Sequence, residues 1–199
     1  MRILVIGAHG TIGSAVVDEL KQRHDIVTAG RSRGDFNVDI ADAASIRKLF
    51  ADAGSIDAVV SAAGNVHFGP LAEITPEQWE IGLRDKLMGQ VNVALEAAKQ
   101  LKPGGSVTLV AGTLSKDPIR YGTSASLVNA ALEGFVRSAA VEFPPGVRIN
   151  AVSPTVLKES MESYGPYFRG SEGVAAKRVA LAFSKSVEGA QTGQVYFVE

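Results

Sequence analysis

The 199-residue sequence carries 20 lysine and arginine residues against 21 aspartate and glutamate residues, which gives a formal net charge of -1. This balance provides no basic field to hold nucleic acid, so we expect no nucleic-acid partner. The sequence has no cysteine, which excludes disulfides, thiol nucleophiles and thiolate metal sites. With 46% apolar residues and no stretch near the roughly 18 apolar residues of a membrane span, it predicts one cytoplasmic domain over residues 1–199 that does not bind membranes.

The first predicted element is a strand that ends in a glycine-rich turn. Apolar residues 3–6 stop at Gly7, and glycines recur at Gly10 and Gly13 as a helical apolar pattern begins. The first glycine allows a tight turn, the second lets a pyrophosphate approach, and the third lets the helix pack on the strand. Backbone N–H groups at the helix start then face the anion. The predicted phosphate site comprises Gly7, His9, Gly10, Thr11, Ile12 and Gly13. A plain strand-to-helix turn is the alternative.

The second predicted strand, residues 25–30, ends where a dinucleotide-binding unit reads the adenosine ribose. An acidic residue at this place accepts hydrogen bonds from the ribose of NAD. This chain instead has Arg31 and Ser32, followed by Arg33. Guanidinium and hydroxyl groups suit a 2′-phosphate, so the sequence predicts NADP(H) in preference to NAD(H). The alternative is that both arginines are ordinary solvated charges.

The rest of the chain alternates between helical and strand patterns. Helices are expected at residues 11–23, 41–53, 75–101, 123–141 and 174–183, and strands at 56–61, 106–111, 147–152 and 194–198. Thr75 is a predicted N-cap, followed by Pro76 and by Gln78 in the capping-box position. The expected core stripe of this helix is Trp79, Leu83, Leu87, Val91, Leu95 and Ala98. Mostly apolar strands separated by helices predict a Rossmann-type doubly wound parallel α/β sheet.

Over nearly its whole length the sequence resembles the short-chain dehydrogenase/reductase family. The resemblance rests on the glycine turn, on residues 38–40 and 61–64, on the run 147–154 and on residues 191–194. In the family the stretch that matches 38–40 contacts adenine, and the one that matches 61–64 lines the cofactor cleft. The stretch that matches 147–154 lies against the nicotinamide, and the one that matches 191–194 precedes the last strand. The resemblance therefore implies cofactor contacts from Asp39, Ile40, Ala62, Ala63, Gly64, Pro154 and Val156. It also implies a homodimer or homotetramer formed through the two long helices.

The catalytic residues of the family are not matched. Its chemistry uses a tyrosine, a lysine four residues later, a serine and an asparagine. When the chain is aligned on Glu133-Gly134-Phe135, the tyrosine position is Ala125 and the lysine position is Asn129. The serine falls at Gly112 or Thr113, and the asparagine falls near Lys86. The chain thus resembles a small atypical subgroup that keeps the scaffold without the usual active-site residues.

Other residues are candidate substitutes for the missing catalytic groups. Tyr121 is either a proton donor or a loop aromatic that covers a helix start, and His67 either faces the nicotinamide or is a capped loop histidine. We interpret His24 as a surface residue, and Ser124 and Ser126 as helix-start hydroxyls. No cluster has metal-ligand spacing, and residues 158–173 predict either a flap near the site or a surface loop. Two hypotheses remain: an NADP(H)-dependent oxidoreductase acting on a small carbonyl or alcohol, and a non-catalytic NADP(H)-binding sensor or assembly protein.

Overall fold

Seven parallel strands form one sheet in the computed structural model, which describes residues 1–199. Their spatial order is β3-β2-β1-β4-β5-β6-β7. The strands are β1 (Arg2–Ile6), β2 (Asp25–Gly30), β3 (Phe36–Asn37), β4 (Ala58–Ser61), β5 (Ser106–Val110), β6 (Arg148–Pro154) and β7 (Val195–Val198). The predicted doubly wound sheet is confirmed, although the short strand β3 was not expected. The strand order reverses between β1 and β4, and ligands of such sheets bind beyond the carboxyl ends of the strands at this reversal.

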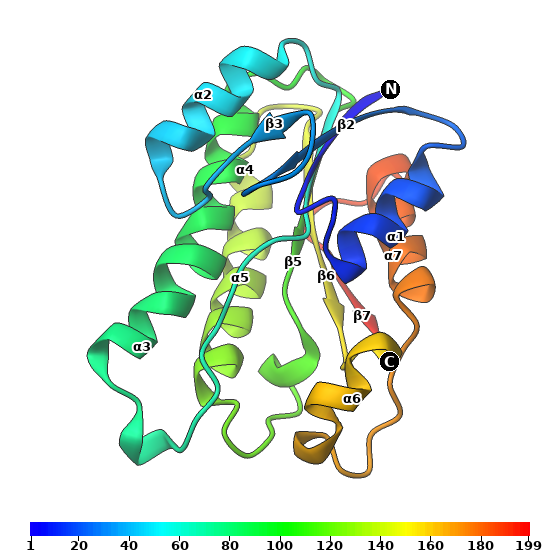
Figure 1. Cartoon of the computed structure of the whole chain (residues 1–199). Coiled ribbons are helices and arrows are strands. Elements are labelled where there is room, and N and C mark those ends of the chain that lie inside the picture. The colour runs from blue at the N-terminus through cyan, green and yellow to red at the C-terminus, as the bar shows by residue number, and fades with distance from the viewer.

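Helices cover both faces of the sheet (Figure 1). One face carries α2 (Ala43–Ala53), α4 (Gln90–Ala98) and α5 (Thr123–Glu142), and the other carries α1 (Thr11–Leu20) and α7 (Ala176–Glu188). The short helices α3 (Pro76–Glu80) and α6 (Met161–Tyr164) lie toward the carboxyl ends of the strands. None of the helices is long and apolar enough to cross a bilayer.

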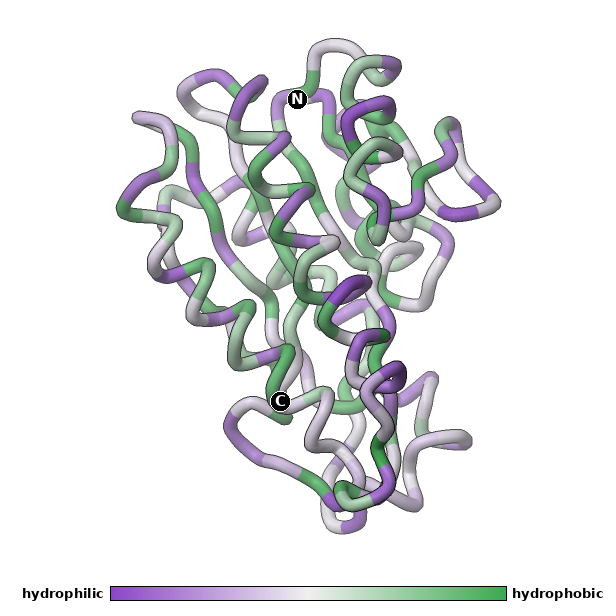
Figure 2. Tube along the Cα trace, turned by 90° about the vertical axis from the view of Figure 1, so that its left-hand side faces the viewer, coloured by the Kyte–Doolittle hydropathy of each residue, from purple (hydrophilic) through white to green (hydrophobic).

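The continuous apolar run of β1 follows from this layering. Leu4 and Ile6 belong to the core cluster under α2, α4 and α5, whereas Ile3 and Val5 belong to the cluster under α1 and α7. Successive strand residues point to opposite faces, and here both faces are buried. Figure 2 accordingly shows hydrophobic stretches along the strands inside the molecule, with hydrophilic segments mostly on helix exteriors and loops.

The predicted helix over residues 75–101 is interrupted. Its start is as expected, because the Thr75 hydroxyl accepts from the Gln78 N–H at 3.3 Å and the Gln78 side chain accepts from the Thr75 N–H at 2.9 Å. However, α3 ends at Glu80, and Ile81–Gly89 form a π-helical segment, η2, before α4 begins. The π geometry turns the following residues to a different face. The expected core stripe is therefore largely wrong: none of its members is fully buried, only Leu87 packs against the core, and Leu95 is 49% exposed.

The junction between η2 and α4 packs through a small residue and a polar side chain. Gly89 packs so closely on the chain that an added Cβ would lie 2.9 Å from Ile40. The amide of the buried Gln90 donates to the Val110 carbonyl and accepts from the Val110 N–H, both at 2.9 Å. These two bonds complete the end of β5, where a side chain replaces a neighbouring strand. The packing of this stretch thus depends on Gly89 and Gln90 as well as on the buried apolar residues Val93, Ala94 and Ala97.

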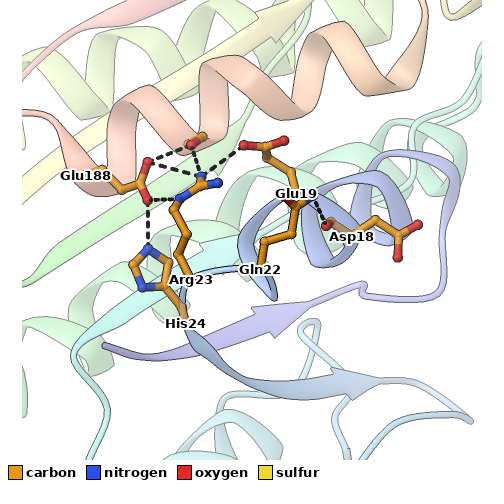
Figure 3. A network of polar contacts seen from close by, with 7 residues as sticks. Asp18, Glu19, Gln22, Arg23, His24 and Glu188 are labelled. Atoms are coloured by element: carbon orange, nitrogen blue, oxygen red, sulfur yellow. Dashed lines mark hydrogen bonds and ion pairs between the residues drawn. The ribbon is translucent and has the colours of Figure 1, made fainter.

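A charged network joins α1 to α7 (Figure 3). Glu188 accepts from Arg23 Nε at 2.8 Å and forms a 2.8 Å hydrogen bond with His24 Nε2, while Arg23 also pairs with Glu19 at 2.9 Å. The expectation that His24 lies on the surface is wrong, since its side chain is only 11% exposed. Arg23 follows the end of α1, and Glu188 is the last residue of α7, so the network ties two helix ends together.

This network predicts an acid-sensitive contribution to stability. Hydrogen bonds from Arg23, and then from Ser184 and His24, lower the pKa of Glu188 from 4.5 to about 2. A carboxylate with a lowered folded-state pKa stabilises the fold above its unfolded pKa, and this stabilisation is lost as the pH falls toward 2.

We expect Glu188→Gln to lower the free energy of unfolding by about 1 kcal/mol near pH 7, because partial solvent exposure screens the interaction. Urea unfolding of both proteins from about pH 7 down to about pH 3 should show the difference shrinking. Glu73→Gln, at an exposed position, is the control, and parallel stability curves for Glu188→Gln and the wild type would contradict the prediction.

Candidate dinucleotide and substrate site

The glycine-rich turn between β1 and α1 has three differently constrained glycines. Gly7 has φ +79°, and a Cβ there would lie 2.7 Å from the Ala62 carbonyl oxygen. A Cβ at Gly13 would lie 2.0 Å from the Gly7 oxygen, so α1 packs directly on the turn. Gly10 is open, with only the Gly7 oxygen at 3.4 Å, and no side chain caps α1. Free N–H groups at an uncapped helix start suit an anion. His9 and Thr11 are exposed beside this opening.

A small cavity of about 160 Å³ lies next to this turn, at the reversal of the strand order. It brings together five of the predicted cofactor residues, namely Gly7, Arg31, Ile40, Ala63 and Gly64. Ser32 and Asp39 are exposed and do not line it. Ala62 contacts Gly7 through its backbone. The small cavity therefore lies between the carboxyl ends of β1 and β2 and one face of η2, and Arg31 lies at its border.

Asp85, which was not predicted from the sequence, is the acidic group of this small cavity. Its Oδ2 atom accepts from the Asn65 side chain at 2.5 Å and from the Asn65 N–H at 3.2 Å. The same oxygen lies 3.4 Å from the Arg31 guanidinium, whose side chain is 65% exposed. Asp85 thus holds Arg31 across the cavity. The only sequence signal was a carboxylate within an amphipathic helix, which ordinarily indicates a solvated face.

A larger cavity of about 340 Å³ shares Gly64 with the smaller one. Its walls come from the end of β6, the loop after β5, α5, η2 and residues 160–168, and they include Ile12, Pro154, Val156, Thr113, Ala125, Tyr164 and Phe168. The segment 158–173 was predicted to be either a flap near the site or a surface loop. It reaches the cavity through Ser160, Tyr164 and Phe168. Four of the wall residues, Leu114, Ala125, Val156 and Phe168, form a separate small apolar cluster.

Two polar side chains in this larger cavity stand at positions where the family pattern was not matched. Asn129 is 2% exposed, and its Oδ1 atom has no hydrogen-bond partner. Lys86 is half-buried and donates from Nζ to the Ala111 carbonyl at 3.1 Å. Burial lowers the pKa of Lys86 to about 8, because desolvation disfavours the ammonium. The cavity therefore holds an amine whose pKa is lowered toward neutral pH and an amide oxygen without a hydrogen-bond partner.

The other candidate substitutes lie outside the cavity. Tyr121 does not line it, and its ring packs edge-on against Tyr167 with centroids 6.2 Å apart. His67 does not line it either. Ser124 and Ser126 lie in the first turn of α5, as expected, but neither caps the helix, because Gly122 is the N-cap and both hydroxyls have no partner.

Glu133 links two elements that form walls of the larger cavity. It is 5% exposed and accepts from the Ser115 hydroxyl at 2.6 Å and from the Ser153 hydroxyl at 3.0 Å. Ser115 belongs to the loop after β5, and Ser153 lies at the end of β6. Because a buried carboxylate needs hydrogen-bond partners, these contacts fix the loop relative to the strand.

A protein-family model described as enoyl-(acyl carrier protein) reductase matches residues 7–195. The chain belongs to the short-chain dehydrogenase/reductase family. Among curated relatives, a probable tetrahydroxynaphthalene reductase of Zymoseptoria tritici is 33% identical over 154 residues, and versicolorin reductase of Emericella nidulans is 31% identical over 152 residues. Each alignment covers 73% of this chain and 55% of the relative, so the chain spans about half the length of these reductases.

Two solved structures match the whole chain. The protein lin1944 from Listeria innocua is 48% identical, with complete coverage of both chains and a TM-score of 0.98. A small-chain dehydrogenase in complex with NADPH is 26% identical, with a TM-score of 0.89 over 100% of this chain and 96% of that one. The family binds a nicotinamide dinucleotide. The open glycine turn and the orphaned Asn129 oxygen of this chain are compatible with such a group.

Proposed function

We propose that this chain binds NADP(H) across the two connected cavities and reduces a small carbonyl compound in the larger one. The observation that carries the proposal is that both cavities meet at Gly64, beside the open N-terminus of α1. A dinucleotide has a phosphate-containing centre and two ring-bearing ends, and this arrangement offers a space for each part. The larger cavity also falls within the range of about 300–1,000 Å³ typical of ligand pockets.

Each group of residues has a distinct role in this proposal. The first turn of α1, with His9, Gly10, Thr11 and Gly13, would hold the pyrophosphate. Arg31 and Ser32 would bind the 2′-phosphate, and Ile40 with Asp39 would contact adenine. Ile12, Pro154, Val156 and Asn129 would border the nicotinamide. When bound, NADPH supplies a hydride. Phe68, Tyr164 and Phe168 in the cavity wall favour a flat, ring-containing ketone.

A non-catalytic NADP(H)-binding sensor or assembly protein is the second candidate. The observation that favours it is that Ala125 and Asn129 occupy the positions where the family has its tyrosine and lysine. Binding alone needs only the cofactor residues, since a ligand stabilises the state to which it binds. Reduction of a ketone such as 2-tetralone with NADPH, followed by nucleotide absorbance, separates the two functions. Turnover above that of the buffer supports the oxidoreductase, whereas saturable NADPH binding without turnover of a ketone panel supports the sensor.

Replacement of Arg31 tests the cofactor preference. We expect Arg31→Glu to weaken NADPH binding at least about 10-fold, because a charged hydrogen bond to phosphate contributes about 1.5–3 kcal/mol. NADH binding should not weaken, because an acidic residue here can accept from the ribose. Fluorescence titration of cofactor-stripped protein with each nucleotide measures both constants. Arg33→Glu is the matched control: it changes the net charge equally, but Arg33 does not line the small cavity. Equal losses in the two variants would indicate a general electrostatic effect and not a 2′-phosphate site.

We further propose that two copies associate through α4 and α5. These helices carry the exposed apolar side chains Leu95, Leu127 and Val141, and a groove between them is lined by Phe135, Ala139 and Phe143. Exposed apolar side chains beside an apolar groove are typical of interaction sites. The resemblance to the family, whose long helices form two-fold interfaces, supports a second copy of the chain as the occupant.

A further inference from the structure

Lys86 is the only cationic side chain in the wall of the larger cavity. It lies in the π-helical segment η2, a rare geometry that recurs at functional sites. Its stem crosses directly over Gly64, where an added Cβ would lie 2.8 Å from Lys86 Cα, Cβ and Cγ. Beyond Gly64 the ammonium reaches the Ala111 carbonyl at 3.1 Å. Glycine at position 64 and the π turn together allow Lys86 to enter the cavity.

No carboxylate forms an ion pair with Lys86. Asp85, its neighbour in η2, binds Asn65 and Arg31 in the smaller cavity. On α5, Glu133 is engaged by Ser115, Ser153 and Arg137. Tyr164, from α6, is the other ionisable side chain in the cavity wall. Lys86 is therefore a half-buried cation without a counter-charge.

The unpaired Lys86 ammonium has free N–H groups that can donate hydrogen bonds to a ligand in the larger cavity. It carries three N–H bonds, and the Ala111 carbonyl accepts one of them. A desolvated charge without a partner is unfavourable, so a lysine with a purely structural role is ordinarily paired or exposed. The family positions for tyrosine and lysine, Ala125 and Asn129, line the same cavity without an ionisable group. The cavity thus has an ionisable cation at Lys86 and none at these two positions.

We propose that Lys86 is the proton donor of this site and that its ammonium binds the carbonyl oxygen of the substrate. The role rests on the reduction proposed above. The C=O π bond breaks, the carbon receives the hydride supplied by bound NADPH, and the electron pair moves to oxygen. The oxygen takes a proton from Lys86 Nζ, which becomes a neutral amine and is reprotonated from water. The ketone is reduced, the nucleotide is oxidised, and Lys86 returns to its starting state.

The lowered pKa of Lys86 agrees with this role. At a pKa of about 8 the side chain is mostly protonated at neutral pH and still gives up a proton readily. Because the protonated form is the donor, the rate of reduction should fall as the pH rises through 8. A lysine with an ordinary pKa near 10.4 would place this fall about two units higher.

Lys86→Met tests the assignment, with Lys177→Met as a control at an exposed lysine on α7. For each protein we would measure the melting temperature, NADPH affinity by fluorescence, and kcat/KM for 2-tetralone from about pH 6 to about pH 10. Lysine-selective ¹³C NMR of wild-type protein gives the Lys86 pKa directly, with the signal assigned by its absence from Lys86→Met. Lys86→Gln provides a second variant if Lys86→Met does not fold.

The expected result is unchanged NADPH affinity in Lys86→Met, a loss of kcat/KM of about 100-fold or more, and loss of the alkaline fall seen in wild type and Lys177→Met. Retention of kcat/KM within about 3-fold, with the alkaline fall intact, would overturn the role of Lys86 and leave the proposed oxidoreductase standing. An NMR pKa near 10.4 would likewise overturn it. Wild-type protein that binds NADPH but reduces no ketone of the panel would overturn the oxidoreductase itself, and the role of Lys86 with it.

Discussion

Gly13→Ala is expected to lower the melting temperature and to weaken NADPH binding at least about 10-fold. The added Cβ would lie 2.0 Å from the Gly7 oxygen, 2.7 Å from the Gly7 carbonyl carbon and 2.9 Å from Ala8 Cα, and all three atoms belong to the backbone. No side-chain rotation relieves these contacts, so α1 must move away from β1. Overpacking of this kind costs about 1–3 kcal/mol, and displaced N–H groups at the start of α1 lose charged hydrogen bonds of about 1.5–3 kcal/mol each.

Two further glycine variants separate stability from binding. Gly134→Ala lies within α5 with no atom inside 4 Å of the added Cβ, so it should stabilise slightly and leave NADPH affinity unchanged. Gly10→Ala meets only the Gly7 oxygen at 3.4 Å and should weaken NADPH binding with little change in melting temperature. Thermal unfolding and fluorescence titration measure both quantities. Wild-type stability and affinity in Gly13→Ala would show that the turn relaxes freely and that it is not a rigid phosphate site.

Leu95→Asp is expected to dissociate the dimer proposed for α4 and α5. In a two-fold interface each substitution occurs twice, so two carboxylates would replace two leucines on the same surface. Loss of a buried leucine removes about 1.5–3 kcal/mol per copy, which predicts at least a 100-fold weaker association. Sedimentation equilibrium over a range of protein concentrations measures the change in mass, and thermal unfolding checks that the monomer stays folded.

Leu181→Asp is the matched control for this substitution. Leu181 is 52% exposed, close to the 49% of Leu95, but it lies on α7, which covers the opposite face of the sheet. We expect its mass to equal that of the wild type. A wild-type protein that sediments as a monomer at all concentrations, or equal dissociation in both variants, would be incompatible with an interface on α4 and α5.

The alternation of strands and helices was predictable from the sequence because it depends on local patterns. Strands buried on both faces are continuously apolar, as in β1, and no other arrangement accommodates that run so simply. The turn at Gly7, Gly10 and Gly13 and the capping box at Thr75 are likewise short-range features with a fixed spacing. These patterns determined the fold class and the place where a nucleotide phosphate is expected.

Which side of a helix faces the sheet is a different kind of property, and here it was decided by tertiary contacts. Close approach of η2 to the chain at Gly64 and Ile40 places Lys86 and Gln90 inward. In α4 the face that enters the core carries Val93, Ala94 and Ala97, whereas Leu95 remains outside. Apolar periodicity predicted the reverse, because it assumes that the largest apolar side chains define the core face.

The same reason explains the site residues that the sequence did not single out. The sequence by itself determined the parallel sheet and the glycine turn, whose residues are neighbours along the chain. Only the tertiary structure brought Asp85 to Arg31 and carried the Lys86 ammonium to the Ala111 carbonyl. These contacts join segments that are distant in the sequence. They form because the backbone packs closely at small residues, which lets long polar side chains reach across.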